Sequence, residues 1–385
     1  MSGTLFETAF APFAAELREL VPARGVVDAH THLGHDEDGR SLDLDSLLGA
    51  LSEVAADARA CVFPLHDPER LPAYRRPNDR VLEWARASEG RLYPFCRLDP
   101  RDDPVGEAER CLARGAQGIK LHPRAQAFDF AQEAVASIFE VAHDAGVPIL
   151  IHAGRGMGRM DALADLALRF PAVPLILAHA AIADQGMFVS RLAGHPGVYY
   201  DTSCFSANDV IELFARVPAE RIVYASDIPY GRPVTSLYLA MRAAAYAGLD
   251  REERGLVAGG TVRALVERRP PPPARAPRAG QTRLVSGRLL RVGGYIANAF
   301  GAMAGGGPPA DPERGRQHLA LARAACRDPD AGEVGPALAR IDETLAAVEQ
   351  LIGDGGDAAP RVFALMIAAG TVAATEPVDG AGAAR

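Results

Sequence analysis

The stretch Val26-Val27-Asp28-Ala29-His30-Thr31-His32-Leu33 is a short apolar run that carries two histidines two residues apart. Alternate side chains of a β-strand share a face, so the spacing predicts that Asp28, His30 and His32 point the same way. Two neutral imidazoles on one strand face are half of a metal site, because a coordination shell needs further ligands. The alternative is an ordinary pair of core histidines. The choice depends on what the rest of the chain supplies.

The composition is that of a soluble globular protein. The chain has 385 residues, of which 48% are hydrophobic and 23% charged, and its formal net charge is −8 at pH 7. This charge gives no electrostatic basis for binding nucleic acid or an anionic membrane surface. No apolar run approaches the roughly 20 residues that a transmembrane helix needs. The five cysteines have no paired spacing, so we expect reduced thiols and a cytoplasmic location.

Eight short apolar runs, each followed by a longer segment, repeat along the first two thirds of the chain. Their starts lie 24 to 34 residues apart, which leaves room for a crossover helix each time. This alternation predicts an α/β fold, a parallel sheet closed into a (β/α)8 TIM barrel. A doubly wound open sheet is the alternative, but no Gly-x-Gly-x-x-Gly turn follows the first run. The predicted strands are 26–33, 60–66, 92–99, 118–123, 148–154, 174–180, 198–203 and 222–229.

The intervening segments have the periodicity of amphipathic helices. In residues 42–58, for example, Leu44, Leu47, Leu48 and Leu51 recur at i, i+3, i+4 spacing. Residues 1–20 are also amphipathic and lack the basic region of a signal peptide. Helices are likewise predicted over 104–114, 131–145, 160–170, 207–217 and 252–269.

A proline-rich segment divides the chain. Four consecutive prolines, Pro270 to Pro273, exclude a helix or a central strand, so residues 270–280 are predicted to be a stiff linker. The barrel with its N-terminal helix is expected over residues 1–269, and a small helical region over 281–385, with residues 376–385 disordered. This region is either an accessory domain or an oligomerisation arm, so a homo-oligomer is one expectation. Its helices are predicted over 283–300, 312–327, 334–351 and 361–374.

Ligand-type residues gather where the predicted strands end. The active site of a parallel barrel lies at the C-terminal ends of its strands. A single histidine there is usually structural, but six of the ten histidines occupy such ends. The only lysine among 41 basic residues lies there too. The residues are His30 and His32 on the first strand, His66 on the second, Lys120 and His122 on the fourth, His152 on the fifth, His179 on the sixth and Asp227 on the eighth.

This order of ligands resembles the amidohydrolase superfamily of metal-dependent hydrolases. The segments Asp28–His32, Gly118–Pro123 and Ala225–Pro229 are similar to the branch that also contains the aminocarboxymuconate-semialdehyde and resorcylate decarboxylases. The resemblance covers about two thirds of the chain, from Val26 to Arg269. The sequence of this chain departs from that of the branch in two places. Ala180-Ala181 stands where a glycine usually follows the strand-six histidine, and Gly259-Gly260-Thr261-Val262 replaces Gly-Gly-Asn-Ala.

The resemblance implies a metal centre. His30, His32, His152 and Asp227 would bind one divalent ion, with zinc the first expectation and manganese, iron or cobalt the alternatives. Such an ion lowers the pKa of a bound water from about 15.7 towards about 7. Asp227 would act as the general base, and His179 would polarise the substrate carbonyl or hold the oxyanion.

Three further residues are expected to contact a small-molecule substrate. Lys120 is interpreted as binding a substrate carboxylate or as structural. The resemblance also offers a binuclear site in which a carbamylated Lys120 bridges two ions. His122 is expected to face the substrate or to hydrogen-bond within its loop. Arg97 would bind a substrate carboxylate bidentately or form an ion pair with Asp99 or Asp201.

Three functions share this site. The leading hypothesis is a metal-dependent hydrolase of a small-molecule amide, ester or lactone. The alternative is a metal-dependent, non-oxidative decarboxylase of an aromatic or enoic acid, in which Asp227 or His179 protonates carbon. A non-catalytic barrel that retains the site for binding is the third. Arg155 and Arg159, in a glycine-rich loop, are additional substrate-binding candidates.

Overall fold

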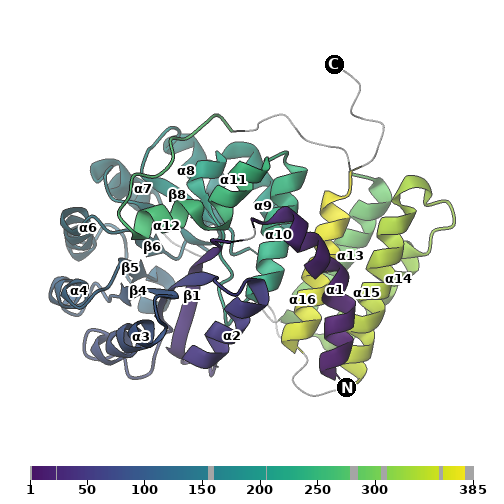
Figure 1. Cartoon of the computed structure of the whole chain (residues 1–385), viewed down its shortest axis with the longest axis horizontal. Helices are drawn as coiled ribbons and strands as arrows, with labels where there is room; N and C mark the ends of the chain where they lie inside the picture. Colours follow the sequence, from purple (N-terminus) through teal and green to yellow (C-terminus); the bar gives the residue numbers. More distant parts are fainter. Residues whose placement is uncertain are drawn as a thin grey trace.

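A computed structural model of the chain describes residues 2–22, 24–154, 160–204, 206–277, 285–304, 310–354 and 359–377. Arg155, Arg159 and residues 378–385, for which predictions were made, lie outside the described residues. Figure 1 shows a barrel of strands surrounded by helices, with a layer of further helices beside it. Among the described helices, none has both the length and the apolar character needed to cross a membrane.

The barrel contains eight parallel strands in sequence order. They correspond to the eight predicted apolar runs, and the two ends of the sheet meet between β1 and the segment after β9. Two backbone hydrogen bonds close the barrel there, from Ala29 N to Tyr224 O and from Asp227 N to His30 O, each 2.9 Å long. The prediction of a closed (β/α)8 barrel is therefore confirmed. The strands are β1 (Val27–His35), β3 (Arg59–Pro64), β4 (Leu92–Arg97), β5 (Gly118–Leu121), β6 (Ile149–Ile151), β7 (Leu175–Leu177), β8 (Val198–Asp201) and β9 (Ile222–Val223).

The first strand continues into a feature that was not predicted. A two-residue strand, β2 (Ser41–Leu42), pairs antiparallel with the end of β1 through Gly34 and His35. Gly34 has a φ of +101°, a left-handed conformation that a residue with a Cβ rarely adopts. The hairpin extends β1 beyond the barrel.

Helices cover the outside of the barrel, and the predicted ones are confirmed. Leu47 and Leu51 of α2 are buried, as the periodicity predicted. Gly146 ends α6 in the left-handed conformation, with a φ of 63°. Helices α3, α5, α8 and α10 were not among the predicted segments. The barrel helices are α2 (Leu44–Val54), α3 (Arg75–Ala87), α4 (Pro104–Ala113), α5 (Pro123–Gln126), α6 (Glu133–Ala145), α7 (Met160–Arg169), α8 (Gln185–Arg191), α9 (Ala207–Arg216) and α10 (Pro233–Tyr246).

The single helix predicted over 252–269 is wrong in detail. The segment consists of α11 (Arg251–Gly255), a π-helical turn η3 (Leu256–Gly260) and α12 (Thr261–Val266). The break follows from a close approach, because a Cβ at Gly259 would lie 2.3 Å from the carbonyl oxygen of Gly25. α12 then closes the N-terminal end of the barrel. Its Val262, Leu265 and Val266 pack in one cluster with inward-facing strand residues such as Val27.

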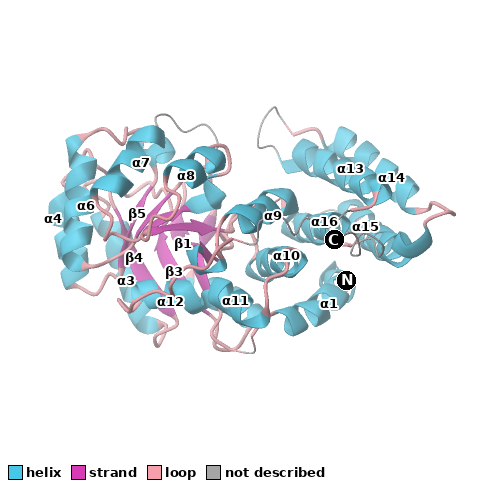
Figure 2. Cartoon of the chain, turned by 90° about the horizontal axis from the view of Figure 1, so that it is seen from above, coloured by secondary structure: helices cyan, strands magenta, loops and turns pink. Residues whose placement is uncertain are grey.

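The helical C-terminal region is present and includes the N-terminal helix in its packing. The helices are α1 (Ser2–Leu20), α13 (Gly287–Ala304), α14 (Pro312–Cys326), α15 (Gly335–Gly353) and α16 (Ala359–Thr375). α1 contacts α15, α16 and the barrel helix α10, and α16 also contacts α10 (Figures 1 and 2). The described residues after Pro270 as far as Pro277 form no helix or strand, which agrees with an extended linker.

Candidate metal centre

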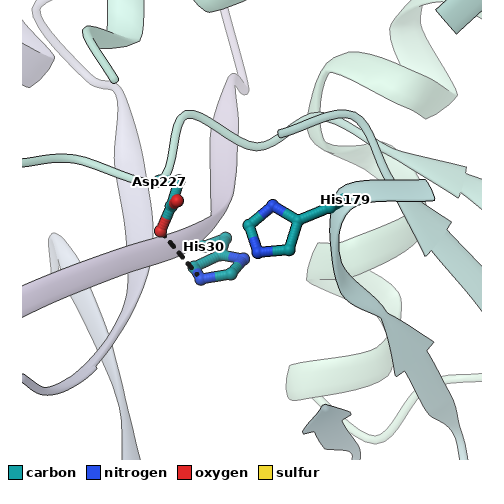
Figure 3. Close-up of side chains that lie close together, drawn as sticks. All are labelled: His30, His179 and Asp227. Atoms are coloured by element: carbon teal, nitrogen blue, oxygen red, sulfur yellow. Dashed lines mark ion pairs between the residues drawn. The ribbon is translucent and has the colours of Figure 1, made fainter. Parts of the chain in front are cut away.

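The predicted ligands meet at the C-terminal end of the barrel. Figure 3 shows His30, His179 and Asp227, which approach one another from β1 and from the segments after β7 and β9. One ligand atom from each residue can be chosen so that all three lie within 4.8 Å of one another. His32, two residues after His30 on the same strand, faces the same cluster. The period-two argument from the sequence is therefore correct for this pair.

Asp227 is the centre of the cluster. Its Oδ1 lies 3.1 Å from His30 Nε2 and 3.0 Å from His32 Nε2, and its side chain is 11% exposed. Burial acts to raise the pKa of Asp227, but His30 and His32 together hold that pKa well below its usual range. The carboxylate therefore stays ionised at neutral pH. Burial lowers the pKa of His32 to about 3, so His32 is neutral.

Asp201 orients two of the histidines and was not predicted as a site residue. Its Oδ2 lies 2.8 Å from His30 Nδ1, and its Oδ1 accepts hydrogen bonds from the backbone N–H groups of His179 (2.8 Å) and Ser203 (2.9 Å). A carboxylate behind an imidazole fixes the tautomer and turns the other ring nitrogen outward. In the sequence, Asp201 was considered only as an ion-pair partner of Arg97. It is the last residue of β8, which lies between β7, the strand before His179, and β9, the strand before Asp227. That position was the signal available in the sequence.

His152 lies behind His179 rather than beside Asp227. The His152 Nδ1 atom is 3.0 Å from His179 Nε2, and its ring stacks on His122 with a centroid distance of 3.9 Å. His179 Nδ1 is 3.0 Å from the carbonyl oxygen of Ser203, so this nitrogen must carry the proton that it donates. Nε2 of His179 is then left with its lone pair. His179 rather than His152 lies in the cluster with Asp227, which favours it as a metal ligand. To bind an ion, Nε2 of His179 must give up its contact with His152 Nδ1, because one lone pair cannot accept a hydrogen bond and coordinate a metal at once.

Asp28 joins the two ligand-bearing segments. The pairing of β1 with β3 shifts register between Asp28 and Thr31, so the strict alternation that predicted one face for Asp28 and the two histidines does not extend to Asp28. The Asp28 Oδ1 atom accepts hydrogen bonds from the backbone N–H of His30 (3.1 Å) and of Ser226 (2.9 Å), the residue before Asp227. The side chain is fully buried, and burial raises its pKa to about 7. Asp28 therefore holds β1 and the segment after β9 in register below the cluster.

The backbone is strained at two ligand positions. His179, Ala180 and Ala181 have φ values of 56°, 54° and 54°, and Asp227 has a φ of 59°. These left-handed conformations cost free energy in residues with a Cβ, and such residues collect at functional sites. The alanines that replace the usual glycine after His179 therefore keep a conformation that glycine adopts more easily.

Two cations line the wall of the barrel beside the cluster. Lys120 and Arg97 are paired neighbours on β5 and β4, and each is 1% exposed. Lys120 Nζ lies 3.3 Å from His30 Nε2 and 4.5 Å from the centre of the Phe63 ring. Burial lowers the pKa of Lys120 to about 7, so its ammonium and amine forms are both populated near neutral pH.

Arg97 has no carboxylate partner among the described residues. Its Nη1 donates to the carbonyl oxygen of Pro64 at 3.2 Å, and its guanidinium lies 5.3 Å from the centre of the Tyr74 ring. Asp99 instead binds Arg101, and Asp201 binds His30. The two ion pairs considered for Arg97 in the sequence are thus absent from the described part of the chain. A buried, unpaired guanidinium is costly unless an anion joins it.

His122 has a local structural role. Its Nδ1 accepts a hydrogen bond of 3.2 Å from the backbone N–H of Ala125 and so caps the short helix α5. Burial lowers the pKa of His122 well below its usual value, with His152 contributing in the same direction. The hydrogen bond within the loop that the sequence allowed is therefore present.

The donor set fits a divalent metal ion. Three imidazoles and one carboxylate converge, and the two ring nitrogens tied to Asp201 and Ser203 leave their Nε2 atoms facing the cluster. Neutral imidazole and carboxylate together are the ligands of zinc, manganese, iron and cobalt sites.

A comparison with protein-family profiles identifies the family of the chain. The amidohydrolase family profile matches residues 27–268. No curated protein matches the chain in sequence. Similar solved structures include 2,6-dihydroxybenzoate decarboxylase from Rhizobium, with 15% identity, 63% of this chain and 99% of that chain covered and a TM-score of 0.49. The 4-oxalomesaconate hydratase from Rhodopseudomonas palustris has 16% identity, with 63% of this chain and 96% of that chain covered, and a TM-score of 0.49. A probable 2-pyrone-4,6-dicarboxylic acid hydrolase from Acinetobacter baumannii has 14% identity, with 63% of this chain and 100% of that chain covered, and a TM-score of 0.48.

The chain belongs to the amidohydrolase family, since the profile spans more than half of it. The resemblance inferred from the sequence is confirmed, and so is the assignment to an enzyme family. The match ends at residue 268, just before the proline-rich segment, and does not include the C-terminal helices.

Proposed function

We propose that the protein is a metal-dependent hydrolase of a small-molecule amide, ester or lactone. The observation that carries the proposal is the convergence of His30, His32 and His179 on the buried carboxylate of Asp227. The described cysteines are buried and form no disulfide bond with one another, which supports the cytoplasmic location that we propose.

The metal would be held by His30, Asp227 and a third imidazole. The sequence predicted His32 and His152 as the remaining ligands, whereas the geometry favours His179. We propose zinc, because the site combines imidazoles with one carboxylate. A bound ion of this kind supplies Lewis acidity and lowers the pKa of water to about 7.

Asp227 would move the proton. As an ionised, buried carboxylate it can accept a proton from the attacking water and return it to the leaving group. Its position is fixed by the backbone hydrogen bond to His30 O, by the two imidazoles and by Asp28 through Ser226. Asp201 would hold His30 and His179 in orientation throughout.

Lys120 and Arg97 would bind the substrate. An anionic group of the substrate between them would satisfy the unpaired guanidinium of Arg97 and favour the ammonium form of Lys120. The same wall favours the alternative function, a metal-dependent decarboxylase, because the reacting group of such a substrate is itself a carboxylate. In that case Asp227 or His179 would deliver a proton to carbon.

A substrate screen separates the two functions. The metal-loaded enzyme is offered carboxylated aromatics, amides and lactones, and released CO2 and released acid are measured separately. Acid without CO2 supports the hydrolase, and CO2 without hydrolysis replaces it by the decarboxylase. The Asp227→Asn variant is the control for both. Turnover by wild-type enzyme stripped of metal would contradict either mechanism.

The metal content tests the mononuclear assignment. We expect about one divalent ion per chain, in keeping with a single cluster in the described residues. About two ions, together with a carbamylated Lys120 in the mass spectrum, would instead support the binuclear alternative.

A further inference from the structure

A second cluster of cationic side chains lies at the opposite end of the barrel from the metal centre. A pocket of about 310 Å³ opens there beside the starts of β1 and β3. Three arginines and one acidic residue are among the residues that line it. The lining residues are Arg24, Gly25, Val26, Val27, Asp57, Arg59 and Arg263.

The unusual Gly259-Gly260-Thr261-Val262 segment builds this pocket. A Cβ at Gly259 would lie 2.3 Å from Gly25 O and 2.6 Å from Val27 N, so only glycine allows η3 to lie against the start of β1. This contact brings α12, and with it Arg263, alongside the first residues of the strand. This close approach depends on Gly259, which the family wording also has, whereas the departure from that wording lies at Thr261 and Val262.

Arg263 is held with part of its guanidinium unsatisfied. The guanidinium lies next to Gly25, where a Cβ would be in ordinary contact with Arg263 Nη1 at 3.5 Å. The Nε atom of Arg263 is buried and has no hydrogen-bond partner in the described part of the chain. A buried polar atom without a partner indicates a missing ligand or water.

The other two arginines reach the pocket from strand starts. Arg59 is anchored by a 2.9 Å hydrogen bond from its Nη1 to the hydroxyl oxygen of Tyr93, and Arg24 is exposed. Glu267, at the end of α12, hydrogen-bonds with Arg269 (2.7 Å) and Tyr93 (3.1 Å). It also interacts electrostatically with Arg59 and Arg263, so it offsets part of their charge without pairing directly with them. None of the three arginines forms an ion pair with a carboxylate of the described residues.

We propose that this pocket binds a phosphate group, either free phosphate or a phosphomonoester. Three guanidiniums outnumber the two nearby carboxylates, Asp57 and Glu267, and leave a positive charge that favours an anion. The planar fork of arginine donates two parallel hydrogen bonds to phosphate oxygens. The pocket is large enough for the phosphate and a small attached group. It is a site separate from the metal centre and does not depend on the function proposed for that centre.

Isothermal titration of the full-length, metal-loaded protein with inorganic phosphate tests this site. Chloride salt keeps the ionic strength constant, because exposed charges are screened by salt. We expect saturable binding that weakens at least about tenfold in Arg263→Met and in Arg59→Met, since each removes charged hydrogen bonds. Arg18→Met, which changes an exposed arginine on α1, is the matched control and should bind like the wild type. A second titration with glycerol 3-phosphate distinguishes an ester from the free ion by which of the two binds more tightly.

Three outcomes would overturn the proposal. They are the absence of saturable binding by either probe, equal binding by both arginine variants and the wild type, and loss of binding in Asp227→Asn. The last would place the anion at the metal centre. Arg59 is exposed at the start of β3, so its variant keeps the test valid should Arg263→Met fail to fold.

Discussion

The barrel mouth and the face between α10 and the C-terminal helices both bury charged side chains, but they combine them differently. On the helical face, opposite charges alternate. Arg242 binds Glu16 and Glu376, and Arg340 binds Glu16 at 2.9 Å. At the mouth, groups of the same kind crowd together: four imidazoles and two cations surround two carboxylates, Asp201 and Asp227.

The difference separates a structural network from a site. Complementary pairs stabilise the packing of α1 against α10 without any further group. The crowded imidazoles do not stabilise the fold by themselves, since burial lowers the pKa of His32, of His152 and of His179 and keeps them neutral. Such an arrangement is expected where a ligand completes it, because preorganised sites store unfavourable contacts.

The largest expected effect is the loss of a ligand at the mouth. His30→Ala should lower catalytic activity by a factor on the order of 10³ or more. A bound ion stabilises the transition state by several kcal/mol, and this stabilisation is lost with the ion. Metal content and turnover are measured together. His35→Ala changes an exposed histidine at the end of the same strand and should leave both unchanged. Full activity in the His30 variant would contradict the site.

Metal removal should destabilise the barrel mouth and not the helical face. A free metal concentration 100 times the dissociation constant is expected to stabilise the folded protein by about 2.7 kcal/mol. The measurement is the shift in melting temperature between stripped and metal-loaded protein. The shift should vanish in His30→Ala and persist in Glu16→Gln. An equal shift in the His30 variant would show that the ion binds elsewhere.

Asp201→Asn tests the orientation of the ligands. The loss of the carboxylate behind His30 Nδ1 should weaken metal binding by about 10- to 100-fold while the fold is retained. A competition titration with a metal chelator measures the affinity. Asp144→Asn, in an exposed position, serves as the matched control. Unchanged affinity in Asp201→Asn would mean that the carboxylate has only a structural role.

The smallest expected effect is at the helical face. Burial acts to raise the pKa of Glu16, but Arg242 and Arg340 lower it below 4.5, its usual value. The stabilisation is therefore fully present above pH 4.5 and is lost as the pH falls through the lower, folded-state pKa. Glu16→Gln should cost about 1.5 kcal/mol of unfolding free energy at pH 7.

Denaturant titrations at several pH values measure this cost. The difference from the wild type should shrink towards zero as the pH falls from 4.5 through the lowered pKa of Glu16 in the folded protein. Glu7→Gln, an exposed change on the same helix, should show no such difference. A difference that grows in acid would contradict the assigned sign.

Much of the barrel could be predicted from the sequence because its signals are local. Alternating apolar runs and amphipathic segments place all eight strands, and the spacing of His30 and His32 fixes their common face. The helix predicted over 252–269 was less accurate, because its break depends on how closely Gly259 approaches Gly25, a contact between distant segments.

The residues that form the site were predicted better than the way in which they are arranged. The chain itself determined that His30, His32, His179 and Asp227 share one end of a barrel, because parallel strands end on the same side. Only the tertiary structure decided that His152 stands behind His179, that Asp201 holds two ligands and that Arg97 lacks a carboxylate partner among the described residues. It also decided that α1 packs with helices from the other end of the chain. The physical reason is that strand position is set by local periodicity, whereas hydrogen-bond partners and charge compensation depend on side chains that meet only when the barrel closes.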